Sequence, residues 1–526
     1  MAGPPLASSL DALAAMEAPA PAMRGPIEEP EPESSPGLST PLLTAPRAKV
    51  DMTAHAGLRG LCATYVLVNH SFLQSYWGQS MNAALLMPIF FLLSGFGLTV
   101  GYGGRDVAPM PCCRELCPPP HEDDGGPKPL DAATFYRNRM AKILPVYWLV
   151  LFASIPLYFV GQVSAYNMKG PFYYSNLWSS DATNPDNGFL SMMLTNVFAV
   201  QMWTLHGMPG MLSQDWFVST IVFWYWIYPC LLPRLQRAFQ RMRERAEPMW
   251  SLQCSLFWVQ FVIGMALAPF GSSYHWPLSR LPVFMMGCFA GLACARLAPG
   301  RGIAWPWTFV PLPAWCGRTL CGTSSEELAE PRKEGEPAPE PAADEAEAEG
   351  WARRVDRAAC LYMVCVFTNA ALGSQYLTVP VWVTSWPWFD TGLVHMGLTI
   401  MLGLARDGGR SWLGTLCRTP AVQFLGQVSM CVYLVQFSVI MFVAYCVHGA
   451  QPYLGFLDCD DYNDDDAAKD ACEEKLADYL HNQEYPIWMA PTICIPSALA
   501  LGVVLERCVE GPASRLLAAP KRRAPG

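Results

Sequence analysis

Two ionisable side chains occur in the first long apolar stretch of the sequence. The segment "GLRGLCATYVLVNH" (57–70) contains Arg59 and His70, eleven residues apart. On an α-helix this spacing is about three turns, so both side chains fall on nearly the same face, about 16 Å apart along the axis, with His70 near the middle of the bilayer. An ionisable residue within a membrane span indicates a functional site. The alternative is a buried neutral histidine that is hydrogen-bonded to a neighbouring helix, because exposing an ionisable group to lipid is costly.

Three basic residues lie at the start of a later apolar stretch. They are Arg137, Arg139 and Lys142, within "FYRNRMAKILPVYW" (135–148). Arg139 and Lys142 are three residues apart and therefore share one face of a helix. Such a pair can bind a phosphate or a diphosphate. It can equally anchor the helix by reaching the lipid headgroups.

The composition predicts an all-α protein that crosses a membrane many times. Of the 526 residues, 52% are hydrophobic and 15% are charged, whereas a soluble domain carries about 25% charged residues. No basic stretch is combined with aromatic residues, so no nucleic-acid partner is expected. A spanning helix needs about 20 apolar residues, and ten stretches meet or approach this length: 57–77, 82–102, 140–162, 214–233, 250–269, 280–297, 357–375, 389–405, 421–447 and 487–505.

The basic residues in the loops predict ten spans with both termini in the cytoplasm. Segment 189–207 is an eleventh apolar stretch, but it is short and contains Asn196 and Gln201. Counting it as a span would place the arginine-rich segment 233–245 outside the cytoplasm, against the tendency of basic loops to stay inside. We therefore expect 189–207 to lie on the outer face or to re-enter it.

Four segments outside these stretches are polar. Residues 1–52 form an arm and 298–355 an acidic Pro/Glu/Ala-rich linker, both predicted to be disordered and cytoplasmic. The acidic loop 448–486 is expected on the outer side, where Cys459 and Cys472 can form a disulfide bond in an oxidising compartment. Residues 518–526 form a basic tail. No metal site is expected, since the acidic loop lacks the spacing of an EF-hand.

Seven motifs, in one order along the chain, resemble those of the membrane acyltransferase-3 family. The first three are Arg59 and His70 with ten residues between them, "FFLLSGF" (90–96), and Arg139-x-x-Lys142 followed by "ILPVYW". The others are "DWFVSTIVFWYWIYP" (215–229), "SRLPVFMMGCFAGL" (279–292), "FLGQVSMCVYLVQFSV" (424–439) and "VEGPASRLL" (509–517). The resemblance places the membrane domain in two parts, 53–297 and 356–517.

The resemblance implies an acyltransferase with ten helices in the lipid bilayer of the plasma membrane or an internal membrane. Family members transfer an acyl group, often acetyl, from acyl-CoA as co-substrate to acceptors that are carbohydrate-like or lipid-like, at a hydroxyl or an amine. No bound cofactor is expected. His70 matches the catalytic histidine and Arg59 its partner, while Arg139 and Lys142, with Arg137, would bind the donor. The side chains expected to line the cavity are Asn69, Ser94, Tyr147, Asp215 and Tyr225.

The sequence departs from the family pattern at several ionisable positions. Lys142 replaces the second arginine of the basic pair, and Ala56 replaces the usual acidic residue before Gly-Leu-Arg-Gly. Ile221, Val283 and Gln436 replace two glutamates and a histidine in the fourth, sixth and ninth spans.

Two other functions therefore remain open. One is a non-catalytic acyltransferase-like scaffold. The other is a transporter in which Arg59 and His70 form a proton or substrate relay. An internal repeat would favour a transporter, and the sequence shows no convincing one.

Overall fold

A computed structural model shows a helical protein. It describes residues 50–73, 75, 81, 83–103, 130–159, 193–203, 214–244, 249–267, 276–296, 341–373, 388–449, 471 and 485–517, all within one compact unit, Pro46–Gly526. These residues form no β-strand, and one isolated bridge joins Ser75 to Tyr485. The all-α prediction is therefore confirmed for the described part of the chain.

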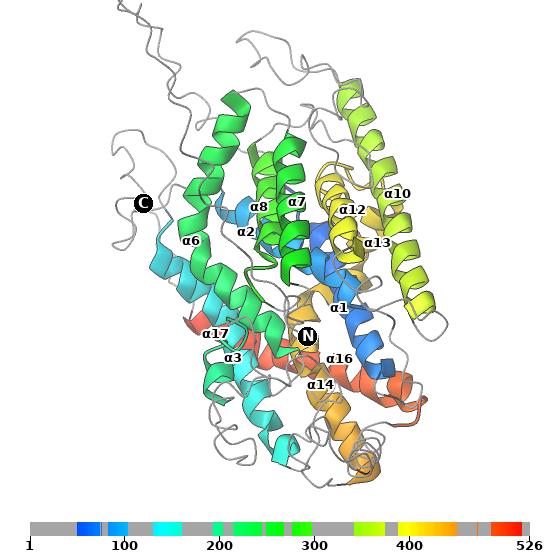
Figure 1. Cartoon of the computed structure of the whole chain (residues 1–526). Coiled ribbons are helices and arrows are strands. Elements are labelled where there is room, and N and C mark those ends of the chain that lie inside the picture. The colour runs from blue at the N-terminus through cyan, green and yellow to red at the C-terminus, as the bar shows by residue number, and fades with distance from the viewer. Residues whose placement is uncertain are drawn as a thin grey trace, which may run out of the picture. The chain divides into compact units, whose positions relative to one another are not determined.

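Each of the ten predicted apolar stretches overlaps a helix or a run of helices among the described residues (Figure 1). In chain order these are α1 (Thr53–Leu73), η1 and α2 (Ala83–Leu86 and Met87–Tyr102), α3 (Ala132–Phe159), α6 (Asp215–Glu244), α7 (Met249–Leu267), α8 (Leu281–Arg296), α10 (Pro341–Gly373), α12 (Trp388–Leu404), α14 (Pro420–His448), and the run of η8, α16, η9 and α17 (Ala490–Cys494, Ile495–Leu505, Glu506–Glu510 and Gly511–Leu517). A further short helix, α13 (Trp412–Arg418), precedes α14.

Five of these helices or runs are long and apolar enough to cross a membrane. They are Ala83–Tyr102, Ala132–Leu157, Asp215–Met242, Pro420–His448 and Ala490–Leu517. Large apolar side chains on them, such as Phe152, Trp226 and Phe442, are about half exposed and suit contact with lipid. The count of ten spans and the orientation of the termini stay predictions.

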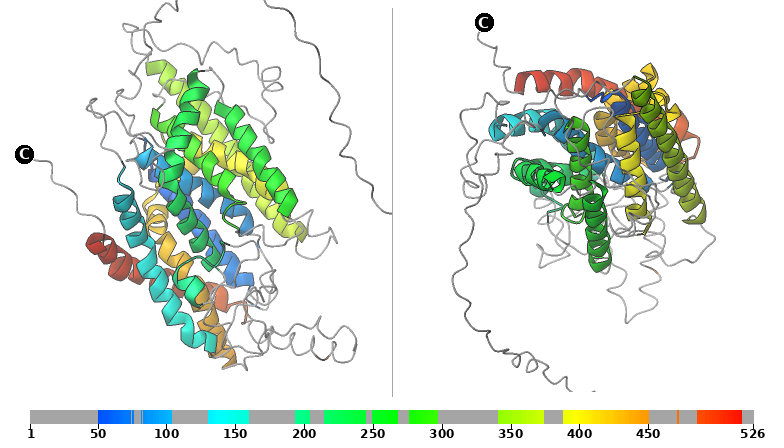
Figure 2. Two further views of the ribbon diagram at one scale, coloured as in Figure 1. Left: turned by 60° about the vertical axis from the view of Figure 1, so that its left-hand side comes forward. Right: turned by 90° about the horizontal axis from the view of Figure 1, so that it is seen from above.

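The first helix packs against a helix from the far end of the chain. α1 and α14 lie side by side (Figures 1 and 2). A Cβ atom on Gly60 would overlap the backbone of Gly426, so glycine at this crossing lets the two helices approach closely. α2 packs against α8 in the same way, through Gly95 and Gly287.

The boundaries of α1 change the expected position of His70. The Asp51 carboxylate accepts a hydrogen bond from the Thr53 backbone N–H (2.9 Å), and the helix begins at Thr53 rather than at 57. It ends at Leu73, so His70 lies in the last turn. His70 is thus close to the end of α1 as the structure describes it, whereas the sequence placed it inside an apolar stretch that runs to residue 77; its depth in the bilayer stays a prediction.

The described part of the arginine-rich segment, residues 233–244, belongs to a helix rather than to a loop. α6 continues to Glu244 because Leu235, Phe239 and Met242 form a buried stripe along its basic end. Their spacing of three to four residues places them on one helical face.

The predicted disordered linker, 298–355, is also partly helical. α10 begins at Pro341, so the end of this segment is ordered. Alanine and glutamate, which dominate it, are strong helix formers. An ion pair between Arg406 and Glu347 (2.9 Å) holds this end of α10 against the residues that follow α12.

The described part of segment 189–207 does not form a spanning helix. It contains one helical turn, 193–197, before Ala199 adopts a positive φ of 53°. The Tyr147 hydroxyl of α3 donates a hydrogen bond to the Asn196 carbonyl oxygen (2.8 Å). A single turn is too short to cross a bilayer.

Candidate functional site

A cavity of about 280 Å³ lies among α1, α2, α3, α6, α14 and η9. It is lined by three basic side chains and one acidic side chain: Arg59, Arg139, Lys142 and Glu510. Of the side chains expected to line a cavity, Ser94 and Tyr225 do so. The structure thus brings the predicted arginine of the first helix to the predicted basic pair of the third.

Arg59 has a defined position because it is bound to the neighbouring helix. Its Nη2 donates a hydrogen bond to the carbonyl oxygen of Gly426 in α14 (2.7 Å). A side chain at position 426 would collide with the backbone of α1, so glycine is what allows this approach. The buried Nε of Arg59 makes no hydrogen bond to the described residues. The guanidinium therefore keeps donor capacity for a ligand.

Aromatic rings surround Arg139. Its guanidinium carbon lies 5.1 Å from the ring centroid of Tyr102, 5.9 Å from that of Phe135 and 6.0 Å from that of Tyr225. Cation–π contacts stabilise an arginine without using its N–H groups. The buried Nε of Arg139 has no hydrogen-bond partner in the described part of the chain. Arg139 can therefore still bind an anion through two N–H groups.

Lys142 lies near a carboxylate that the sequence analysis quoted in a motif but gave no role. Its Nζ is 4.0 Å from Oε1 of Glu510, at the end of η9. The other carboxylate oxygen, Oε2, accepts a hydrogen bond from the Cys431 thiol (3.2 Å). The partners come from the third helix and the last run of helices, so no local sequence pattern could have connected them.

His55 is a second residue that the sequence analysis missed. It lines the same cavity and is fully buried. Its Nε2 forms a hydrogen bond with the Met401 carbonyl oxygen of α12 (2.9 Å), and its ring stacks on Phe96 of α2 at 4.7 Å. It precedes the predicted start of the first span, which is why hydropathy did not select it.

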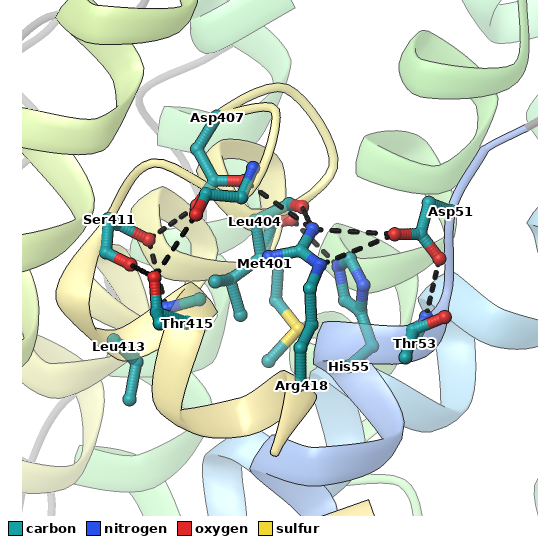
Figure 3. A network of polar contacts seen from close by, with 12 residues as sticks. Asp51, Thr53, His55, Met401, Leu404, Asp407, Ser411, Leu413, Thr415 and Arg418 are labelled. Carbon is teal, nitrogen blue, oxygen red and sulfur yellow. Dashed lines mark hydrogen bonds and ion pairs between the residues drawn. The ribbon is translucent and has the colours of Figure 1, made fainter. Parts of the chain in front are cut away.

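An ion network fixes the start of α1 beside the cavity. Nη2 of Arg418 lies 3.4 Å from Oδ2 of Asp51, before α1, and 3.6 Å from Oδ1 of Asp407, after α12 (Figure 3). Hydrogen bonds from Thr53, with the nearby charge of Arg418, hold the pKa of the Asp51 carboxyl below its ordinary value of 3.8. His55 lies within this group of residues, so the network positions one wall of the cavity.

His70 does not line this cavity. Its ring centroid lies 4.6 Å from that of Phe437, and its ring lies beside the Gln436 side chain. Gln436 is fully buried. Nδ1 of His70 makes no hydrogen bond to the described residues, and the same holds for both amide atoms of Gln436.

The remaining predicted site residues lie elsewhere. Arg137 is exposed, and its Nε donates a hydrogen bond to the Leu517 carbonyl oxygen. It is two positions before Arg139, an offset that turns it roughly 160° away from the Arg139 side of the helix. The cavity lining does not include three further residues that were expected there: Asn69, Tyr147 and Asp215.

Two positions that depart from the family pattern are apolar and buried. Ile221 lines the cavity, and Val283 lies in the core of α8. Cys459 and Cys472 lie outside the described residues. Among the residues that the structure does describe, no group of three or more His, Cys, Asp or Glu side chains could hold a metal ion.

These features define a helical membrane protein with a cationic cavity between its helices. A comparison with family models matches residues 55–317 to the acyltransferase domain of the acyltransferase-3 family. The match covers half of the chain. The chain therefore belongs to the acyltransferase-3 family, a family of membrane acyltransferases. No curated protein and no solved structure matches it.

Proposed function

We propose that this protein transfers an acyl group, most simply acetyl, from acyl-CoA to a hydroxyl or amine of a carbohydrate-like or lipid-like acceptor. The observation that supports this proposal is the convergence of three cations, Arg59, Arg139 and Lys142, on one cavity. In an interior of low polarity such a group of cations favours an anionic ligand strongly. Membership of an acyltransferase family makes an acyl donor with phosphate groups the best candidate.

The donor binds with its phosphates at the cations. Arg139 offers a planar guanidinium held by aromatic rings, and Lys142 is half exposed beside it. Arginine suits two-point contact with a phosphate, whereas lysine acts as a point charge. The pantetheine arm then extends along α1 from Arg59 towards His70, about 16 Å further along the helix axis.

His70 acts as the general base. Its imidazole takes the proton of the acceptor hydroxyl while the hydroxyl oxygen attacks the carbonyl carbon of the thioester. The tetrahedral intermediate collapses when the carbon–sulfur bond breaks, and the imidazolium returns the proton to the departing CoA thiolate. Phe437 packs on the ring and sets its orientation. The atoms balance without a further reactant: acyl-CoA and acceptor become acylated acceptor and free CoA.

The experiment that tests this proposal follows the acyl group itself. Purified protein in liposomes receives radiolabelled acetyl-CoA and a mixed pool of sugar and lipid acceptors, and both CoA thiol release and the labelled product are measured. We expect release from wild type and its loss in His70→Ala, and the product identifies the acceptor class. Absence of release and of donor binding by wild type, with acetyl-CoA and with longer acyl-CoAs, would reject the proposal in favour of a transporter or scaffold.

A further inference from the structure

Glu510 places a negative charge in a cavity whose other charged lining residues are cations. Of the lining residues that the structure describes, it is the one acidic side chain. Its side chain is 11% exposed, compared with 50% for Lys142. The proposed donor carries phosphate groups, so its binding would bring further negative charge close to this carboxylate.

A change in helix type points Glu510 into the cavity. The buried residues Ala498, Gly502 and Leu505 follow the spacing of an α-helix, and the next buried residue, Glu510, comes five positions later. Five residues rotate an α-helix by roughly 500°, which would leave Glu510 about 140° away from the Leu505 face. Residues 506–510 form a π-helical turn instead, which suits a five-residue step. Such turns occur frequently at functional sites.

The Glu510 carboxylate contacts two side chains and lies near a second cation. It lies 4.0 Å from the Lys142 ammonium and accepts a hydrogen bond from the Cys431 thiol. Arg59 is close enough to interact with it electrostatically. Glu510 thus partly neutralises the cations that line the cavity.

We propose that Glu510 is a positioning residue that lowers and tunes the affinity of the cavity for the anionic donor by occupying Lys142. This inference rests on the proposed function. When the donor binds, Lys142 exchanges the carboxylate for a phosphate group. The negative charge of Glu510 then repels the bound phosphates and helps CoA to leave after transfer. A purely structural role would make the opposite prediction, because loss of a structural contact weakens binding.

The test is direct binding of CoA and of adenosine 3′,5′-bisphosphate to the full-length protein in nanodiscs. Glu510→Gln removes the charge and keeps the shape. We expect it to lower the Kd of both ligands about tenfold at low salt, with a smaller effect at high salt. Glu510→Asp draws the charge back towards the helix, so we expect it to lower the Kd of both ligands two- to threefold. This variant provides the test if Glu510→Gln does not fold.

Glu506→Gln is the matched control. It removes one charge from the same turn at a residue that does not line the cavity, and we expect its Kd to stay within twofold of wild type. The kinetics of acyl transfer distinguish the tuning role from a purely structural role. Glu510→Gln should lower the KM for acyl-CoA, and where CoA release limits turnover it should also lower kcat. Unchanged or weaker binding by folded Glu510 variants would overturn the inference while leaving the proposed function intact. Failure of wild type to bind either ligand would overturn both.

Discussion

The Arg59 guanidinium donates a hydrogen bond to the carbonyl oxygen of Gly426, 2.7 Å away on a helix from the far end of the chain. An α-helical carbonyl normally accepts only from its own helix, so this contact depends on the close approach of α1 and α14. A small residue at the crossing permits that approach. One glycine thereby determines where a candidate donor-binding cation lies.

Replacement of Arg59 should affect donor binding more than stability. Arg59→Lys keeps the positive charge but lacks the planar guanidinium, which can bind the Gly426 carbonyl and a phosphate at the same time. We therefore expect the KM for acyl-CoA to rise about tenfold. Arg59→Ala should lower kcat/KM at least about 100-fold, equivalent to roughly 2.7 kcal/mol. Steady-state kinetics in liposomes provides the measurement. Arg241→Ala, an exposed arginine on α6, is the control for loss of a positive charge.

The two histidines of α1 should separate in their kinetic effects. His70→Ala removes the proposed base and should lower kcat by about 10²- to 10⁴-fold with little change in donor affinity. His55 lines the cavity, but its Nε2 is bound to Met401. His55→Gln should therefore change the KM for the donor more than kcat. If kcat depends on His55 alone, the general base is His55, at the start of α1, and not His70.

The glycine contact predicts a steric effect on stability. A Cβ at Gly60 would meet the backbone of Gly426 and force α1 away from α14. Gly60→Ala should destabilise the protein by about 1–3 kcal/mol, the typical cost of overpacking, and should lower activity through displacement of Arg59. Thermal melting in nanodiscs measures the first effect. Gly101→Ala in α2 is the control, since a Cβ there meets no atom within 4 Å.

The ion network predicts two effects of different size. Asp407 is fully buried beside Arg418, and its replacement by Asn should cost about 3 kcal/mol because it removes the buried one of the two carboxylates that pair with this arginine. Asp51 is largely exposed, so Asp51→Asn should cost at most about 1 kcal/mol. Melting temperatures of both variants measure the difference, and equal effects would contradict this account.

The contribution of Asp51 to the stability of the fold should decrease at low pH. Its pKa is lower in the folded protein than the ordinary 3.8, so the ionised form is stabilised by folding. The contribution is fully present above about pH 4 and is lost as the pH falls through the lowered pKa. The stability difference between wild type and Asp51→Asn should therefore be constant from about pH 7 to pH 5 and should shrink towards pH 3. A difference that grows on acidification would show that the assigned direction is wrong.

The sequence predicted the helices well because lipid-facing helices need long apolar runs. It failed at their ends, where local contacts rather than the length of an apolar run determine where a helix begins and ends. Asp51 extends α1 at its start, and the buried stripe of Leu235 and Phe239 extends α6 beyond its apolar part. Neither effect raises hydropathy, so neither could be found from apolar length.

For the cavity, helical spacing predicted one shared face for Arg139 and Lys142, and both line it. Arg137 was expected to bind the donor together with them, but it is exposed and does not line the cavity, because a two-residue offset turns it to another face of α3. Glu510 was not predictable, since its orientation depends on a π-helical turn that has no known sequence signal here. His70 was expected at mid-span, and its position in the last turn follows from the ends of α1.

The contact between Arg59 and Gly426 also has a consequence for biosynthesis. The two residues are 367 positions apart. At about 5–20 residues per second, a ribosome needs roughly 20–70 s to make the second after the first. During that interval the α1 guanidinium lacks its carbonyl partner and the cavity lacks its α14 wall. A nascent chain therefore completes this cavity only when translation is nearly finished, and a truncated product that ends before α14 lacks both this contact and this wall.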